Sequence, residues 1–392
     1  MIYLGDEFVN KNKLATFRFL MTTVILFLIL LALIIYLIIS NSDSKVLINS
    51  VKSIDYKDNT FYVVGNTNDN DNYVEKAKFS IYDNKFNKTK EKLYNKSYAS
   101  SYNDFYLDKN TYVFVGNISE SKNSHKKNIN KSVIIKYDDE DNIIFEKTYS
   151  LYDNNSFTNI SKLDEDYLVV GYSNDDKKGS SIIIRYDSKG KVIWKSNFGD
   201  NIYSRFNSAI VLDNYIYAVG LSNKNIGVIC KYDFDGNLVS YKEYKFTDDL
   251  GFSDIVSYKN NLYVVGGFKL TDTTTINSAL IIKYDLSLNI VNEEKIENNY
   301  DNRYNSIIVD NNNYLIVIGN SKEDDYNGLI SKYDTNLNCI ATVSYGDEKN
   351  DYFNDIVLYD NNYLVVGYSS DKHKYQTKFI TYSDALKVLE AK

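Results

Sequence analysis

From about residue 46 to its end, the chain alternates short apolar runs with polar turns. In the stretch NDIVLYDNNYLVVGYS (354–369), two apolar runs flank a polar YDNN segment, which predicts a β-hairpin. Similar runs of 5–8 residues recur along the chain, rich in Val, Ile, Tyr and Phe and bounded by Asn, Asp, Ser and Gly. They are nearly continuous in apolar character, which is typical of sheets covered on both faces.

These hairpins belong to a repeat. A strand ending in glycine recurs seven times, 46 to 55 residues apart, and a second strand ending in Tyr, usually Tyr-Asp, alternates with it. Each unit contains four predicted strands, so residues 43–392 are expected to form an all-β, seven-bladed β-propeller with four-stranded blades. The repeated residues are Gly65, Gly116, Gly171, Gly220, Gly266, Gly319 and Gly367, and Tyr82, Tyr137, Tyr186, Tyr232, Tyr284, Tyr333 and Tyr382.

Each repeated residue has an expected role. The glycine is expected to end the second strand, where a side chain would hinder a bend or the close approach of another backbone. The Asp that follows the tyrosine suits the turn after the third strand. The phrase DFDGN (233–237) hints at a calcium loop, but it occupies this turn and lacks the ordered ligands of an EF-hand, so we interpret it as a turn.

The line GSSIIIRYDSKGKVIWKSNFGD (179–200), followed by NSAIVLDNYIYAVGLS (207–222), resembles the bacterial β-propeller repeats of the SBBP type. Those repeats carry a KYD-like strand, a turn with glycine, a strand often holding Trp, and a Y-V-x-G strand. The resemblance covers about residues 46–392 and is strongest in the third unit, which holds Trp194. It implies the fold and often an envelope or secreted setting, and it implies no particular chemistry.

Spacing within the repeat indicates where function lies. The distance from the tyrosine to the first-strand core residue of the next unit is 23 residues in all six cases, whereas the distance from the glycine to the next tyrosine varies from 12 to 21. The variation falls in the loop between the second and third strands. In a propeller this loop shares a face with the links between blades, and variable loops on a fixed scaffold commonly carry binding. We therefore expect the functional surface on that face.

An uncharged segment precedes the repeats, from Phe19 to Ser42, with the apolar run Leu20–Ile39 at its centre. Twenty apolar residues match the thickness of a bilayer, and no A-x-A-like cleavage site follows. The sequence predicts a tail over 1–18, a transmembrane signal anchor over 19–42 and the propeller beyond. The flanking basic residues are nearly balanced, but a short inside tail with a translocated domain is the commoner arrangement. We expect a bacterial plasma-membrane protein with an extracytoplasmic propeller.

Three sets of residues are candidates for binding. The first lies in the longest variable loop and offers a basic contact for an acidic partner, although a solvated loop is the simpler interpretation. The second is a pair of arginines at one repeat position, able to hold an anion or to form local surface ion pairs. The third is a set of aspartates at another shared position, suited to calcium or to hydrogen bonds from backbone amides. They are Lys122, His125, Lys126 and Lys127; Arg205 and Arg303; and Asp104, Asp254 and Asp355.

The remaining chemistry is sparse. Cys230 and Cys339 fall in different repeats, so a bridge between them is not expected. The chain has two histidines, both in variable loops, and no metal-binding or nucleophile motif, so no catalytic residue and no cofactor is assigned. A net charge of −7 argues against a nucleic-acid partner. The sequence favours a non-catalytic binding or scaffold module for a protein or a cell-wall glycan. A glycan lyase or hydrolase acting at the channel mouth and a sensor coupled to another membrane protein stay open.

Overall fold

The computed structural model describes Leu30 and residues 48–392, apart from 69–73, 121–128, 176–177, 200–201, 224–225, 246–250, 270–276, 297–299, 347–348 and 372–373. Residues Leu47–Lys392 form one compact unit. No helix within the described residues is long and apolar enough to cross a membrane. The predicted anchor over 19–42 lies outside these residues except for Leu30.

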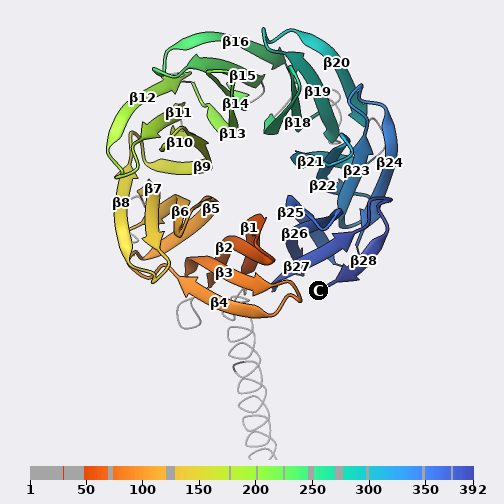
Figure 1. The fold of residues 1–392 in the computed structure, drawn as a ribbon, viewed down its shortest axis with the longest axis horizontal. Helices are drawn as coiled ribbons and strands as arrows, with labels where there is room; N and C mark the ends of the chain where they lie inside the picture. The colour runs from red at the N-terminus through yellow and green to blue at the C-terminus, as the bar shows by residue number, and fades with distance from the viewer. Residues whose placement is uncertain are drawn as a thin grey trace, which may run out of the picture. The chain divides into compact units, whose positions relative to one another are not determined.

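Seven four-stranded antiparallel sheets surround a central channel, each made of four consecutive strands (Figure 1). The first strand of each blade is innermost and the fourth lies at the rim. The predicted seven-bladed propeller is therefore confirmed. Blades 1 to 3 are β1 (Asn49–Lys57), β2 (Thr60–Asn68), β3 (Glu75–Asp83) and β4 (Lys88–Leu93); β5 (Ala99–Asp108), β6 (Thr111–Ser119), β7 (Asn130–Asp138) and β8 (Ile143–Tyr149); β9 (Asn154–Leu163), β10 (Asp166–Asn174), β11 (Gly179–Tyr186) and β12 (Val192–Phe198).

The remaining four blades follow in the same order. They are β13 (Arg205–Leu212), β14 (Tyr215–Ser222), β15 (Ile226–Asp233) and β16 (Leu238–Lys245); β17 (Phe252–Tyr258), β18 (Asn261–Lys269), β19 (Asn277–Asp285) and β20 (Ile290–Ile296); β21 (Asp301–Val309), β22 (Leu315–Lys322), β23 (Tyr326–Tyr333) and β24 (Cys339–Tyr345); β25 (Asn350–Tyr359), β26 (Asn362–Ser370), β27 (Tyr375–Tyr382) and β28 (Val388–Ala391).

The repeated glycine does not end the second strand, so that prediction is wrong. In every blade the strand continues past it, and the glycine faces a β-bulge in the first strand. A Cβ on Gly319 would stand 1.8 Å from the carbonyl oxygen of Arg303, and the other six glycines are equally crowded by backbone. The close approach of another backbone, the second reason anticipated for the glycine, is therefore what requires it.

The Asp after the tyrosine closes the turn between the third and fourth strands, as predicted. Asp233 accepts hydrogen bonds from the amides of Asp235 and Asn237 at 3.0 and 2.8 Å. The phrase DFDGN is thus a turn. Hydrogen bonds from Asn237 and nearby amides hold the pKa of Asp233 below its ordinary value.

Cys230 and Cys339 are both free thiols.

One turn position between the third and fourth strands carries glycine where an aromatic ring from the preceding blade occupies the space beside it. A Cβ on Gly236, in blade 4, would stand 2.6 Å from the ring of Trp194 in blade 3. Where this turn position, which has a positive φ in every blade, carries a large residue instead, that residue itself is buried, as Leu288 and Leu337 are. Trp194 therefore fills the space that a turn side chain fills elsewhere.

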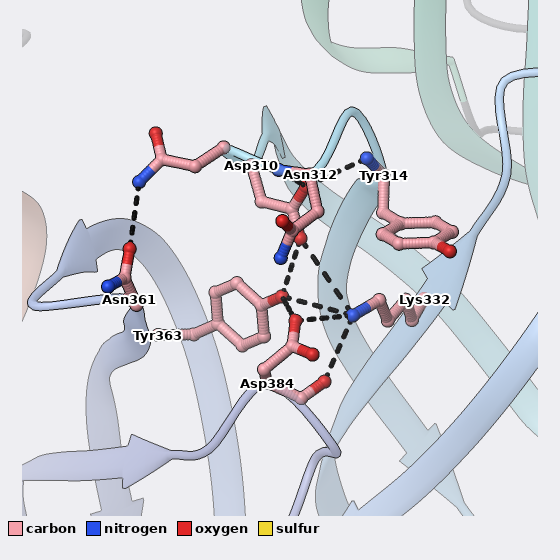
Figure 2. A network of polar contacts seen from close by, with 8 residues as sticks. Asp310, Asn312, Tyr314, Lys332, Asn361, Tyr363 and Asp384 are labelled. Carbon is pink, nitrogen blue, oxygen red and sulfur yellow. Dashed lines mark hydrogen bonds and ion pairs between the residues drawn. The ribbon is translucent and has the colours of Figure 1, made fainter.

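Polar struts join the blades on the face opposite the variable loops. In blades 2 to 6 the residue before the repeated tyrosine is basic, and from blade 3 onward it donates to a carbonyl in the next blade's turn. The strut between blades 6 and 7 is a network in which Lys332, Asp310 and Tyr363 are buried and Asp384 is exposed (Figure 2). Lys332 Nζ lies 2.6 Å from Asp384 and 3.8 Å from Asp310, and the hydroxyl of Tyr363 donates to Asp310 at 2.7 Å. A matching Lys136, Asp108 and Tyr167 group joins blades 2 and 3.

Candidate binding site at the channel mouth

The channel wall is built by the seven innermost strands, each interrupted by one bulge. In most blades the bulged residue is Asn or Thr, and its side chain donates to a backbone carbonyl of the next blade. Asn207 reaches Phe252 at 2.6 Å, and Asn305 reaches Phe353 at 2.7 Å. The bulge thus turns a side chain sideways and links neighbouring blades around the channel.

The residue after each bulge forms a second ring. These positions are Ser53, Asp104, Asn159, Ser208, Asp254, Ser306 and Asp355. The predicted aspartates therefore do surround the channel. Each accepts a hydrogen bond from a backbone amide of a neighbouring blade: Asp104 from Ile160 at 3.0 Å, Asp254 from Ile307 at 3.1 Å and Asp355 from Ile54 at 2.9 Å. The hydrogen bonds from backbone amides that were anticipated for these aspartates are thus present.

Two serines connect the three carboxylates. Ser53 Oγ lies 2.9 Å from both Asp104 and Asp355, and Ser306 Oγ lies 3.0 Å from Asp254 and 3.2 Å from Asp355. A hydroxyl has a single hydrogen to donate, so each serine satisfies one carboxylate at a time. A proton held on Asp355 lets that group donate to a serine in return.

Burial in the channel wall raises the pKa values of the three aspartates. It raises the pKa of Asp104 to about 6 and of Asp355 to about 7, with further contributions from the charge of Asp254 on Asp104 and of Asp104 on Asp355. The pKa of Asp254 is raised for the same reason. Among the described residues, no group of three or more His, Cys, Asp or Glu is arranged to hold a metal ion.

The arginine pair lies at the entry to the innermost strands, on the face of the blade links. Arg205 begins β13 and Arg303 lies in β21, and the blade between them has Gly251 at this position. A weak hydrogen bond of 3.4 Å leads from Arg303 Nη2 to Ser253 of that middle blade. Arg303 thus contacts blade 5, and the charge of Arg205 acts on it from blade 4.

This pair has no carboxylate within ion-pair distance among the described residues, although the charge of Asp301 acts on Arg303. Arg185 forms an ion pair with Asp166 at 2.7 Å, but no such contact joins Arg205 or Arg303 to a carboxylate of the described residues. The Nε atoms of both arginines are shielded from solvent and have no hydrogen-bond partner there. Burial, together with the charge of Arg205, lowers the pKa of Arg303 to about 10. Arg205 and Arg303 are each partly exposed, and two like charges close together with their Nε atoms buried are costly unless an anion pairs with them.

The loop residues Lys122, His125, Lys126 and Lys127 lie outside the described residues. Sequence reasoning missed the serines and asparagines that complete the two rings. Their signal is a triplet in each repeat, such as NDF (103–105), NSI (305–307) and NDI (354–356), in which a bulge residue and a ring residue precede a buried apolar one.

No family model and no curated protein matches the chain. Solved structures do resemble it. The β-propeller domain of the Trilobed protease from Pyrococcus furiosus, described as having an open velcro topology, has a TM-score of 0.50 and 14% identity, covering 89% of this chain and 95% of that one. KlAtg21, in complex with the coiled coil of AgAtg16, has a TM-score of 0.52 and 12% identity. The match covers 88% of this chain and 99% of that one.

A third similar structure comes from an analysis of two prolyl endopeptidases, with a TM-score of 0.52 and 11% identity. The match covers 89% of this chain and 50% of that one, so it concerns part of the enzyme. At such identities the likeness extends to the fold alone. It includes propellers from peptidases and a propeller bound to a protein partner.

Proposed function

We propose that the chain is a non-catalytic binding module, tethered to a bacterial plasma membrane by residues 19–42, with its propeller outside the cytoplasm. It scaffolds an envelope assembly by holding an acidic ligand, either a protein segment or a wall polymer, at the mouth of the channel. The resemblance to SBBP-type repeats and the apolar run Leu20–Ile39 support the placement.

One observation carries the binding proposal, namely that the Nε atoms of Arg205 and Arg303 are buried and have no hydrogen-bond partner among the described residues. Their guanidinium groups present planar donors suited to carboxylates and phosphates. An anionic group over Gly251 would supply the hydrogen-bond acceptors that both Nε atoms lack among the described residues. The carboxylates deeper in the channel accept hydrogen bonds from the wall itself, which favours a structural role over acid catalysis.

The test uses the full-length chain in detergent, captured on beads and offered poly-L-glutamate, polyglycerol phosphate or neutral dextran. We expect retention of one or both anionic polymers and of no dextran. The double variant R205Q/R303Q is expected to reduce retention at least fivefold. Its matched control, K189Q/K191Q, removes the same charge from an exposed turn on the opposite face and should stay within twofold.

Equal losses of retention in the two double variants would show that binding depends on net charge alone. That result would contradict a binding site at Arg205 and Arg303. Recovery of chemically cleaved polymer would contradict a non-catalytic binding module and would indicate an enzyme that acts on glycans. Placement is tested separately with protease on intact cells. Protection of the propeller until the cells are lysed would contradict an extracytoplasmic domain.

A further inference from the structure

The junction between blades 7 and 1 differs from the other six. Its apolar cluster contains seven buried residues, whereas the clusters at the other junctions contain ten to twelve. The channel side is well joined: Asn354 donates to the carbonyl of Val51 at 2.5 Å, and Asp355 accepts from Ile54. The deficit therefore lies farther from the channel.

A lysine replaces an apolar core residue at this junction. The residue paired with the repeated glycine across the second and third strands is Lys78 in blade 1. In blades 2 to 6 the same position carries a buried aliphatic side chain: Val133, Ile182, Val228, Leu280 and Leu329. Lys78 is 4% exposed and donates to the side-chain oxygen of Asn49, and it forms no ion pair with a described residue.

A polar cleft of about 470 Å³ opens where the apolar packing stops. Its volume lies within the range of roughly 300–1,000 Å³ typical of small-molecule sites. One wall comes from all four strands of blade 1 and includes Lys78, Asn68 and Glu91. The other comes from the start of β27, at Lys374, Tyr375 and Gln376. The cleft thus offers several donors, a carboxylate acceptor and one aromatic ring.

That ring is held by a row of four tyrosines in contact with one another on the variable-loop face. The centroid distances are 5.0 Å from Tyr326 to Tyr352, 4.9 Å from Tyr352 to Tyr368 and 5.2 Å from Tyr368 to Tyr375. The row begins in blade 6 and ends in the cleft. Because Tyr368 contacts Tyr375, the ring is held before any ligand arrives, which lowers the entropic cost of binding.

We propose that this cleft binds one sugar unit of an anionic glycan. The apolar face of the sugar packs against Tyr375, its hydroxyls meet the amide and carboxylate groups of the cleft, and its anionic group pairs with Lys78 and Lys374. Glu91 accepts a hydrogen bond from a sugar hydroxyl. Its negative charge disfavours a ligand that is anionic along its whole length. The site is separate from the arginine pair and does not depend on the function proposed there.

Calorimetric titration of the full-length chain in detergent tests the proposal, with trigalacturonate, glucose 6-phosphate and neutral maltotriose as probes. We expect the uronate or the phosphosugar to bind at least tenfold more tightly than maltotriose, and the stronger of the two identifies the anionic group. K78M and Y375A are each expected to weaken that binding at least tenfold.

The matched control is K378M, because Lys378 holds the same repeat position in blade 7 and does not line this cleft. It should change affinity less than twofold. K374Q alters an exposed residue that the fold does not need, so it reports on binding even if another variant unfolds. Equal affinity for all three probes, no binding to any of them, or unchanged affinity in K78M, Y375A and K374Q would overturn the proposal.

Discussion

Two buried lysines at neighbouring junctions have opposite surroundings. Lys332, between blades 6 and 7, is enclosed by Asp310, Asp384 and Tyr363 (Figure 2). Lys78, between blades 7 and 1, meets an asparagine, and burial lowers its pKa to about 8. Removing a charge that has ion-pair partners leaves those partners unpaired, whereas Lys78 has no ion-pair partner among the described residues and is available to a ligand. Burial alone therefore does not distinguish a structural lysine from a binding one.

The largest expected effect is at Lys332. The variant K332M leaves Asp310, which is 6% exposed, without its cation. Since removing one partner of a buried ion pair is strongly destabilising, we expect the free energy of unfolding to fall by about 3 kcal/mol. Urea denaturation of the full-length chain measures this loss.

A matched control is K283M. Lys283 holds the same repeat position but donates to the carbonyl of Thr335 at 2.9 Å and forms no ion pair within 4 Å with a carboxylate of the described residues. Losing a hydrogen bond of this kind should cost about 1 kcal/mol. Equal losses in the two variants would mean that the ion network adds nothing to the strut.

The next effect concerns Asp355, which contacts both junctions from the channel side. Its pKa of about 7 lies above the ordinary value of 3.8, so the folded chain binds the proton more tightly than the unfolded one. Stability should fall as pH rises from about 4 to about 7 and level off above that. D355N removes the contribution of Asp355 to this slope, leaves that of Asp104, and should be more stable than the wild type by about 1–2 kcal/mol at pH 8.

The reverse change provides the check. Asn159 occupies the same ring position and accepts the amide of Ala209 at 3.0 Å through its side-chain oxygen. N159D adds a fourth carboxylate beside Asp104, so it should steepen the decline in stability between pH 4 and 7. Thermal melts across this range decide the matter, and parallel pH profiles in D355N, N159D and the wild type would refute the coupling.

The smallest expected effect is at Lys78. Its folded-state pKa of about 8 lies below the ordinary 10.5, so folding releases a proton between these values and stability rises with pH over that interval. Below pH 8 the full cost is present, and K78M should match or exceed the wild type by less than about 1 kcal/mol. The advantage should shrink by pH 10 in thermal melts. A loss in K78M as large as that in K332M would erase the contrast between the two junctions.

The fold was predictable because it repeats. One hairpin is ambiguous, but seven copies of a glycine strand and a Tyr-Asp strand require an architecture with seven equivalent environments. The turn role of Asp233 and the shared position of Asp104, Asp254 and Asp355 followed from the same alignment of repeats. The position of the glycine was misjudged because a bulge in a partner strand leaves no mark on the strand that faces it.

The cleft and the struts were not predictable from one repeat at a time. Lys78 is unusual only when compared with its five buried aliphatic counterparts, and the reason for the change lies in blade 7, some 300 residues away. Likewise, Arg205 and Arg303 interact although they belong to blades 4 and 6, which are not consecutive. Such features arise where two blades meet. Which residues meet there depends on how the ring of blades closes, and the local sequence pattern of one repeat does not show it.

Because every sheet consists of four consecutive strands, with none exchanged between blade 1 and blade 7, the genetic repeat and the structural blade share the same boundaries. A tandem duplication or deletion of one repeat would therefore add or remove a whole sheet and leave no strand orphaned at the seam. Such a ring can change its number of blades one step at a time, and the seam between its first and last members is where each such change must be accommodated.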